Sequence, residues 1–423
     1  MTEDFLHYIW RYRLLNTSYY ELENGQKLEI LTPGFHNTDA GPDFLNARIR
    51  LDGTTWAGNI EIHTSATDWY KHKHQQDLKY DNIILHVVYE DDVPIKRNNE
   101  ELITTLCVKN CFDEKLFSRY KELLASSLWI PCEKNLSGIN QNLMNIWKEK
   151  LVVARLQKKS EEIEKVLLNN KNDWSQTFYE FLFRNFGFKI NAIAFEMLAK
   201  SLPISYLAKH KDSLFQTEAL LFGQAGFLND TLKDEYPRAL LKEYKFLKQK
   251  FSVNPINHSL WNLLRLRPYN FPQIRIAQLA SLLHNSSVSF SKVIEAENVE
   301  FLSDMFSVEC SDYWRTHYLF DKESPTKNCS LGKSSIENII INTIVPFLFA
   351  YGTLKNEFSY KDRALTFLEN LSVEKNHIIR NWDERGIIAK TAWDSQALIA
   401  LKNSYCSNKK CLDCMMGDAI LRS

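Results

Sequence analysis

The sequence lacks the features that mark secreted and membrane-spanning proteins. Its N-terminus, MTEDFLHYIWRYRLL, begins with acidic residues and has no apolar core followed by small residues, so we expect no signal peptide. The longest apolar stretch, residues 339–352, is interrupted by Asn342 and Pro346 and is shorter than the about 20 residues of a membrane span. Hydrophobic residues make up 44% of the chain and charged residues 25%, as in a folded globular protein. We therefore expect a soluble, cytoplasmic protein with no membrane partner.

Cysteine usage is ordinary. The 423 residues include eight cysteines, and their uneven spacing predicts reduced thiols rather than a disulfide framework. The chain has no internal repeat, no low-complexity tract and no HEXXH zinc motif. The pair Gly223 and Gly226 is too short a motif to predict a phosphate-binding loop.

The net charge is zero, because 52 lysine and arginine residues balance 52 aspartate and glutamate residues. The balance is uneven along the chain. Residues 1–120 carry 13 basic and 19 acidic side chains, whereas residues 231–280 carry nine basic and three acidic ones. Such an asymmetry permits a polyanionic partner such as nucleic acid but does not require one.

The first 115 residues alternate short helices and strands, which predicts an α/β module. Apolar residues at helical spacing predict helices over residues 4–15 and 65–80. Strand-like runs occur at residues 27–31, 44–51, 56–63, 82–89 and 101–108. Asp52 and Gly53 predict a tight hairpin turn between two of these strands. The expected order is helix, three-strand meander, helix, strand.

The pattern becomes helical from about residue 116 to the C-terminus. Apolar residues recur at intervals of three and four in residues 143–169, 174–187, 190–203 and 241–251. The fold class we expect is therefore α+β, with an α/β domain at residues 1–115 and a helical domain at residues 116–423. Residues 286–293 contain a candidate subdivision of the helical domain, near residue 290.

Residues 41–63, GPDFLNARIRLDGTTWAGNIEIH, contain the strongest candidate site. Alternate side chains of a strand share a face, so Glu61 and His63 project together while Ile62 points into the core. A hairpin turn at residues 52–54 would bring Asp43 beside the end of the following strand. Two carboxylates placed in this way suit Mg²⁺ or Mn²⁺. A metal ion there would polarise a phosphodiester and lower the pKa of an attacking water.

These residues resemble the PD-(D/E)XK nuclease superfamily, because Pro42-Asp43 precedes Glu61-Ile62-His63 by seventeen residues within the expected element order. The resemblance implies a restriction-endonuclease-like domain in which Asp43, Glu61 and the backbone carbonyl of Ile62 bind the metal. It also implies that Asp43, Glu61 and His63 are catalytic. His63 stands where the superfamily usually has a lysine. A lysine supplies a permanent charge, whereas a histidine, with an ordinary pKa of about 6.5, could act as base, metal ligand or hydrogen-bond donor.

A wider likeness runs along most of the chain. From FLHYIW through GPDF, GNIEIH and ILHVVYEDD to the cysteine-rich end, the sequence is similar to an uncharacterised bacterial family of unknown function. This likeness implies no activity, so the chemistry is predicted from residues 1–110 alone.

Histidines are concentrated in the first domain. Five of the eleven fall between residues 36 and 86: His36, His63, His72, His74 and His86. A zinc site made from His63, one histidine of the second helix and a carboxylate would suit a metallohydrolase. The alternative for each histidine is a surface or hydrogen-bonded structural role. His86, within an apolar strand, fits a satisfied core residue.

The C-terminal segment places Cys406, Cys411 and Cys414 in a C-x4-C-x2-C pattern. Three thiols at this spacing can bind zinc or an iron–sulfur cluster if a fourth ligand comes from elsewhere. Candidates for that ligand are Cys132, Cys310 and Cys329. The layout is similar to a metal staple of some nucleases in the resembled superfamily, in which Cys132 would be the remote cysteine. Ordinary thiols without a metal are the alternative.

A basic region in the helical domain has aromatic residues between its charges. Its cationic candidates for nucleic-acid binding are Lys242, Lys245, Lys248, Arg265, Arg267 and Arg275. Phosphate contacts and stacking would suit a nucleic-acid strand. A solvated helix face is the alternative.

Together these patterns predict metal-dependent hydrolysis of nucleic-acid phosphodiester bonds, by an endonuclease or an exonuclease that uses Mg²⁺ or Mn²⁺. Two alternatives stay open: a catalytically inactive scaffold that binds nucleic acid or protein, and a zinc metallohydrolase. The sequence predicts neither the oligomeric state nor a preference for DNA or RNA.

Overall fold

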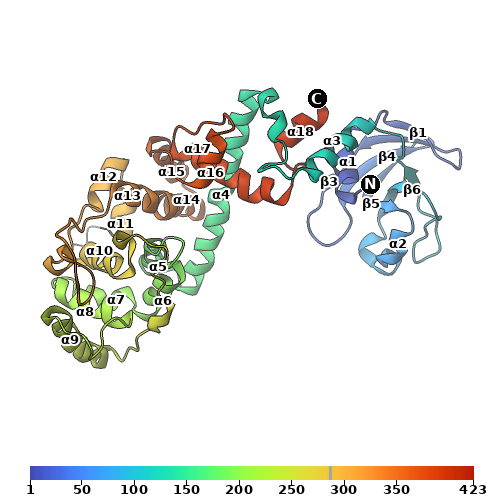
Figure 1. Cartoon of the computed structure of the whole chain (residues 1–423). Helices are drawn as coiled ribbons and strands as arrows, with labels where there is room; N and C mark the ends of the chain where they lie inside the picture. Colours follow the sequence, from blue (N-terminus) through green and yellow to red (C-terminus); the bar gives the residue numbers. More distant parts are fainter. Residues whose placement is uncertain (285–287) are drawn as a thin grey trace. The chain divides into compact units, whose positions relative to one another are not determined.

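The computed structural model describes residues 1–284 and 288–423. The chain is a mixed α+β protein with two compact units: unit 1 is Met1–Trp147 with Leu401–Ser423, and unit 2 is Lys148–Ala400. Unit 1 contains a curled sheet, and unit 2 is almost wholly helical (Figure 1). The boundary expected near residue 115 differs from this division. The subdivision expected near residue 290 falls partly on residues 285–287, outside the described residues.

The sheet of unit 1 has seven strands: β1 (Tyr19–Glu21), β2 (Lys27–Thr32), β3 (Phe35–His36), β4 (Phe44–Leu51), β5 (Thr54–Ser65), β6 (Ile83–Glu90) and β7 (Thr105–Cys107). Their order is β1-β2-β4-β5-β6-β7, and β3 pairs with β4 outside this path. β2, β4 and β5 form an antiparallel meander, whereas β6 and β7 continue the sheet in parallel. The predicted strands at 27–31, 44–51, 56–63 and 82–89 are present as β2, β4, β5 and β6.

The hairpin of β4 and β5 contains a bulge. It turns at Asp52 and Gly53, whose φ angles of 47° and 84° are those of the expected two-residue turn. The strands then pair in one register as far as Ala47 opposite Gly58, but Phe44 lies opposite Ile60. β4 therefore has one extra residue, and the left-handed Asn46 (φ 57°) lies within this bulge. The bulge shifts the residues at the start of β4 by one position relative to β5.

The helix predicted over residues 65–80 is wrong. The segment forms α2 (Asp68–Lys71) and two 3₁₀ turns, η1 (His74–Gln76) and η2 (Leu78–Tyr80). Lys73 has a φ of 62°, which ends the helix. Residues two apart on a continuous helix point about 200° away from each other. The break allows the rings of His72 and His74 to lie near one another, with centroids 5.4 Å apart.

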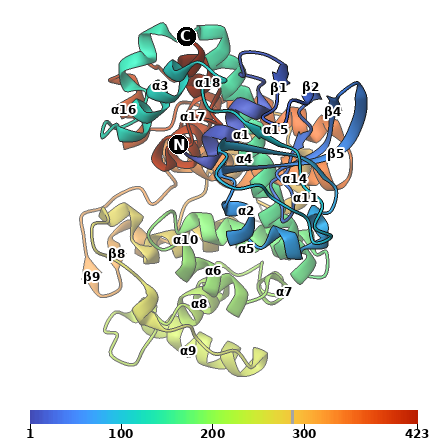
Figure 2. The same ribbon diagram turned by 90° about the vertical axis from the view of Figure 1, so that its right-hand side faces the viewer.

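The rest of unit 1 consists of α1 (Glu3–Arg11), α3 (Glu114–Ala125), η3 (Glu133–Gly138), the π-helical turn η8 (Leu401–Tyr405), η9 (Cys406–Asn408) and α18 (Met415–Arg422). α3 and α18 lie side by side in both views (Figures 1 and 2). Phe5 on α1 stacks on Tyr120 of α3, with ring centroids 5.5 Å apart. Arg119 donates a hydrogen bond to the carbonyl of Leu421 at 2.8 Å. These contacts explain why α3 and the C-terminal residues belong to unit 1.

α4 (Gln141–Asn169) begins in unit 1 and continues into unit 2. The other helices of unit 2 are α5 (Trp174–Phe186), α6 (Ala192–Ser201), α7 (Ile204–Ala208), α8 (Leu214–Gln224), α9 (Glu235–Phe251), α10 (Pro272–His284), α11 (Phe290–Glu295), α12 (Val299–Met305), α13 (Lys333–Ile339), α14 (Val345–Leu354), α15 (Phe358–Asn370), α16 (His377–Asp383) and α17 (Ala392–Ala400). Short turns η4 (His258–Leu260), η5 (Pro268–Asn270) and η6 (Asp312–Arg315) and the ribbon of β8 (His317–Leu319) and β9 (Lys322–Glu323) connect them. The four long helical segments expected in this region are present as α4, α5, α6 and α9.

The most apolar helical stretch of unit 2, Lys333–Leu354, is long and apolar enough to cross a membrane by length and composition. It runs from α13 through the π-helical turn η7 (Ile340–Ile344) into α14, so Asn342 and Pro346 do not interrupt it as expected. Pro346 is tolerated because it stands at the start of α14, directly after the π-turn. Because 72% of its most apolar window is buried inside the protein, the stretch packs as a core helix.

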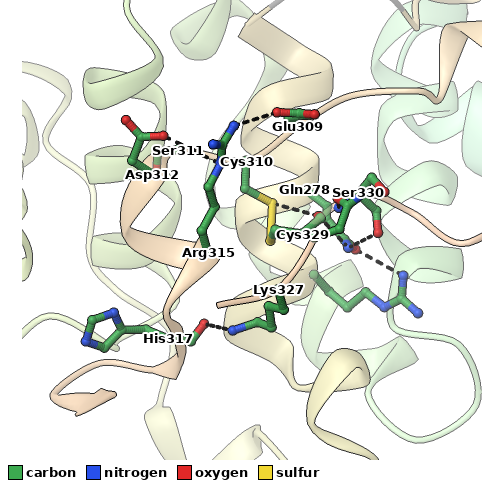
Figure 3. Close-up of a disulfide and its surroundings, with 12 residues drawn as sticks. Gln278, Glu309, Cys310, Ser311, Asp312, Arg315, His317, Lys327, Cys329 and Ser330 are labelled. Carbon is green, nitrogen blue, oxygen red and sulfur yellow. Dashed lines mark hydrogen bonds and ion pairs between the residues drawn. A yellow bond between two sulfur atoms is a disulfide. The ribbon is translucent and has the colours of Figure 1, made fainter. Parts of the chain in front are cut away.

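Unit 2 also contains a disulfide between Cys310 and Cys329 (Figure 3), which corrects the expectation of reduced thiols. The carbonyls of Cys329 and Ser330 accept hydrogen bonds from the side-chain amide of Gln278, at 3.1 and 3.3 Å. Cysteine spacing could not predict the bond, because only the packing of α10 against this loop brings the two thiols together. The disulfide removes Cys310 and Cys329 from the candidates for a fourth metal ligand.

Candidate metal centre

Asp43 and Glu61 meet at the open end of the β4–β5 hairpin. The backbone N–H of Asp43 donates to Oε2 of Glu61 at 3.2 Å, and that of Ile62 donates to Oδ2 of Asp43 at 2.9 Å. Without the bulge at Asn46, the register would set Asp43 opposite Ile62, on the other face of the sheet from Glu61. The bulge therefore aligns the two acids. The side chain of Ile62 is fully buried, and a metal contact of its carbonyl stays a prediction.

Three histidines lie beside Glu61 and form what we call the histidine cluster: His63, His72 and His74. One ring nitrogen of each lies within 4.8 Å of the others. Nε2 of His63 is 3.1 Å from Nδ1 of His72, and the rings of His63 and His74 are stacked with centroids 5.3 Å apart. His63 is 1% exposed, whereas His72 is exposed to solvent. The cluster therefore extends from the buried sheet to the surface.

Helix α1 contributes to a second group, the carboxylate cluster: Glu3, His7 and Asp43. Its ligand atoms also lie within 4.8 Å of one another, and Nε2 of His7 is 3.2 Å from Oδ2 of Asp43. Glu3 and His7 face the same side because they are one helical turn apart. Neither Glu3 nor His7 was among the site residues expected from the sequence. The spacing of an acid and a histidine by four at the start of the first expected helix was the signal that could have found them.

Glu61 connects the two clusters. Its Oε1 lies 3.1 Å from Nε2 of His74 and 3.6 Å from Nε2 of His63, while its Oε2 accepts the bond from Asp43. Nε2 of His7 and Nε2 of His74 are buried close to carboxylate oxygens, yet neither makes a hydrogen bond of acceptable geometry. Buried polar atoms in native proteins almost always have partners. Each of these two nitrogens could instead take a metal ion as its partner, His74 in the histidine cluster and His7 in the carboxylate cluster.

The electrostatics of the site also favour a cation. Burial, and after it the charge of Asp43, raises the pKa of Glu61 and that of Glu3. Burial and the neighbouring histidines lower the pKa of His63 to about 2, and burial lowers the pKa of His74. Without a cation, Glu61 keeps its proton at neutral pH because its pKa is raised to about 9, while His63 and His74 stay neutral and keep a free lone pair. A metal ion would displace the proton of Glu61 and use those lone pairs.

His86 on β6 lies directly behind His63. Its Nε2 is 2.8 Å from Nδ1 of His63, and β6 pairs it with Glu61 across the sheet. It is fully buried, as expected, but it is not satisfied, because its Nδ1 has no partner. When Nε2 of His63 gives its lone pair to a metal, Nδ1–H can donate to His86. Metal-binding histidines are oriented in this way by a second residue.

A cleft of about 430 Å³ opens beside His7 within unit 1. The charged side chains that line it are Arg11, Lys409, Lys410, Asp4 and Asp413. Cations thus outnumber acids, and Tyr12 adds an aromatic surface. The cleft places positive charge next to the carboxylate cluster, where a backbone phosphate would need it.

The four cysteines predicted as a metal set all lie in unit 1. Cys132, Cys411 and Cys414 are buried free thiols and Cys406 is partly buried. Burial, followed by Cys414 and Cys411, raises the pKa of Cys132 to about 12. Burial also raises the pKa of Cys414, although N–H groups of Gly417 and Met416 that donate to its sulfur oppose the rise. Within the described chain the four sulfurs are not gathered as closely as the ligands of the two clusters above.

The basic residues predicted to bind nucleic acid lie in unit 2 and differ in environment. On α9, Lys242 is exposed, Lys248 is half-buried, and Lys245 forms an ion pair with Asp230 at 2.6 Å. Arg265 and Arg267 are exposed. Arg275 is only 4% exposed, so it cannot belong to the same solvent-facing surface.

Comparison with known proteins gives a family without an activity. A family model described as "Protein of unknown function (DUF2851)" matches residues 3–377, nearly the whole chain. No curated protein and no solved structure matches the chain.

Proposed function

The chain belongs to the DUF2851 family, and from its side-chain geometry we propose that it is a metal-dependent hydrolase of nucleic-acid phosphodiester bonds. The observation that carries the proposal is the position of Glu61, whose two oxygens reach the histidine cluster on one side and Asp43 on the other. In this proposal the N-terminal module is restriction-endonuclease-like.

The ligand types favour a transition metal. Imidazole nitrogens mixed with carboxylates suit Zn²⁺ or Mn²⁺, whereas Mg²⁺ prefers oxygen ligands alone. The histidine cluster and Glu61 would hold one ion, and the carboxylate cluster offers a second place. A bound ion supplies Lewis acidity and a water of lowered pKa.

His63 acts in this proposal as a metal ligand. Its low pKa keeps it neutral at physiological pH, so it cannot supply the permanent charge of a lysine. His86 holds its ring in place from the buried side. Of the three roles open to a histidine at this position, metal ligation is the one that its neighbours support.

The substrate class follows from the cleft beside His7. Arg11 and Lys410 would contact backbone phosphates, and the guanidinium groups of Arg11 and Arg422 lie over the ring of Tyr12 beside them. The basic residues of α9 in unit 2 are a further candidate contact with a long strand.

The test is metal-dependent cleavage by the full chain. The wild type, stripped of metal and reloaded with Mn²⁺, Zn²⁺ or Mg²⁺, should cut at least one member of a panel of single- and double-stranded DNA and RNA. Glu61→Gln should lower the rate by about 100-fold or more, because it removes the residue that joins both clusters. Glu29→Gln, which changes a carboxylate of β2 outside both clusters, should leave cleavage unchanged.

Absence of cleavage with every metal would contradict the hydrolase. Tight metal binding without cleavage would instead favour the inactive scaffold. Equal loss in the two variants would show that stability rather than the site is responsible.

We also propose that Cys132, Cys406, Cys411 and Cys414 hold a structural zinc ion or iron–sulfur cluster. Its support is that four thiols from two distant segments interact in one unit, and that N–H groups face the sulfur of Cys414, as they do around metal-bound thiolates. Elemental analysis should find metal that Cys411→Ser/Cys414→Ser loses and Glu61→Gln keeps. Metal-free protein in which all six free cysteines titrate would contradict this assignment.

A further inference from the structure

Unit 2 contains a cavity of about 730 Å³, within the usual size range of small-molecule sites. One wall is apolar and includes Phe186, Phe195 and Ile341. The lining also contains six charged residues: Lys189, Arg275, Lys333, Lys375, Glu337 and Glu374. Four cations against two acids leave a surplus of two positive charges around the cavity.

Arg275 is the buried cation of this cavity. It is 4% exposed, and its hydrogen-bond acceptors are the neutral groups of Gln278, Asn270 and Ser335, at 3.0, 2.5 and 3.1 Å. Its Nε–H has no hydrogen-bond partner. Phe188 lies under the guanidinium at 4.6 Å, but no carboxylate pairs with it among the described residues.

A buried charge without a counter-ion is strongly unfavourable. Burial lowers the pKa of Arg275 to about 10, so the group still carries its charge at neutral pH. The usual ways to stabilise such a charge are an ion pair or a bound ligand of opposite sign. Since no acidic side chain fills that place, an anionic ligand is the remaining partner.

The guanidinium is held in place rather than free to turn away. Gln278, which accepts the bond from Nη1, itself donates to the carbonyls of Cys329 and Ser330 next to the disulfide (Figure 3). The hydroxyl of Ser335 on α13 accepts a second hydrogen bond, from Nη2 of Arg275. A cation fixed by neutral groups, with one N–H left over, is preorganised for an anion.

Three exposed lysines of the cavity lining indicate how much negative charge a ligand would need to carry. Lys189, Lys333 and Lys375 are exposed, and Lys333 has only a long ion pair of 4.0 Å with Glu337. The surplus of two positive charges matches a phosphate monoester, which carries about −1.5 to −2 at neutral pH, better than a single carboxylate. The apolar wall and the size of the cavity leave room for a ring system attached to that phosphate.

We propose that this cavity binds a phosphate monoester of nucleotide size, with the phosphate against Arg275 and the ring system against the apolar wall. The proposal concerns unit 2 alone and does not depend on the metal centre. It assigns Arg275 to a small-molecule site rather than to the nucleic-acid surface expected from the sequence.

Calorimetric titration of the full chain, with EDTA present, tests the proposal with three probes: AMP, inorganic phosphate and adenosine. AMP should bind, inorganic phosphate should compete with it, and adenosine should bind at least about tenfold more weakly because it lacks the charge. Failure of AMP to bind at several millimolar, or equal binding of adenosine, would overturn the proposal.

Variants locate the binding. Arg275→Gln should abolish AMP binding, and Lys333→Ala/Lys375→Ala, which changes two exposed residues, should weaken it about tenfold. Lys322→Ala/Lys355→Ala removes the same charge at two exposed positions elsewhere in unit 2 and should have no effect. If Arg275→Gln does not fold, the lysine pairs decide, and equal weakening by both would contradict the site. Glu61→Gln should bind AMP like the wild type, which separates this proposal from the metal centre.

Discussion

Units 1 and 2 differ in the ionisable groups that they bury at their candidate sites. In unit 1 the acids Glu3, Asp43 and Glu61 converge, and burial together with the charge of Asp43 raises the pKa of Glu3 and that of Glu61. In unit 2 Arg275 is a buried cation whose hydrogen-bond acceptors among the described residues are all neutral. From these groups we expect a cation to bind in unit 1 and an anion to bind in unit 2.

Replacement of His63 by lysine should have the largest effect on ligand binding, because it should abolish the cation site expected in unit 1. His63→Lys restores the residue usual in the resembled superfamily, but it places a fixed positive charge where we expect a metal ion. Binding of Zn²⁺ or Mn²⁺ should fall by more than about 100-fold, the upper end of the loss for an outer-shell partner. Titration calorimetry with each metal measures this loss, and His258→Lys in unit 2 is the matched control. A lysine variant that cleaves better in Mg²⁺ than the wild type would contradict the ligand role.

Glu218 is a buried acid of unit 2, and its protonation state should affect the stability of the protein. Burial raises its pKa to about 7 from the ordinary 4.5, although Tyr236 and Ser311 donate hydrogen bonds to it. Between these two values the folded state holds a proton that the unfolded state has lost, so stability falls as the pH rises through this window. The loss should amount to about 3 kcal/mol in the free energy of unfolding.

The measurement for Glu218 is the melting temperature of wild type and Glu218→Gln between pH 4 and 8. The difference between them should change across the window in favour of the variant, because the amide has no charge to bury at high pH, although only its oxygen can accept a hydrogen bond. Glu300→Gln, on the exposed surface of α12, should follow the wild type. A constant difference at every pH would contradict a raised pKa and would mean that unit 2 buries a carboxylate in its charged form.

His86→Phe should have the smallest effect on ligand binding, and it tests whether His86 orients His63 for the metal. The substitution keeps a buried ring but removes the acceptor behind His63. We expect metal affinity to fall by about 10- to 100-fold, as for other partners of metal-binding histidines. Calorimetry with Zn²⁺ measures the affinity, and unchanged binding would show that His86 is only a packing residue.

Local pattern predicted much of unit 1 correctly. Residues 44–51 form β4 with the bounds that alternation gave, and Asp52 and Gly53 make the expected turn. The proximity of Asp43 and Glu61 also followed from the hairpin. The reason for their alignment did not, because a bulge at Asn46 depends on tertiary packing that the sequence pattern does not express.

The parts of the two sites that the sequence did not predict depend on long-range contacts. A left-handed Lys73 turns His72 and His74 to one side, against the helical periodicity of residues 65–80. α1 brings Glu3 and His7 to the sheet only after folding. In the sequence nothing distinguishes Arg275 from the neighbouring basic residues. Its burial could not be predicted, because it depends on the packing of α10 with the disulfide loop.

We expect a cation to bind beside Glu61, where the histidine cluster meets the carboxylate cluster. Anomalous diffraction at the zinc edge from crystals of the full chain grown with Zn²⁺ tests it most directly. We expect a peak within bonding distance of Glu61, His63 and His74. A peak confined to the C-terminal cysteines, or none in either place from zinc-saturated crystals, would contradict the claim.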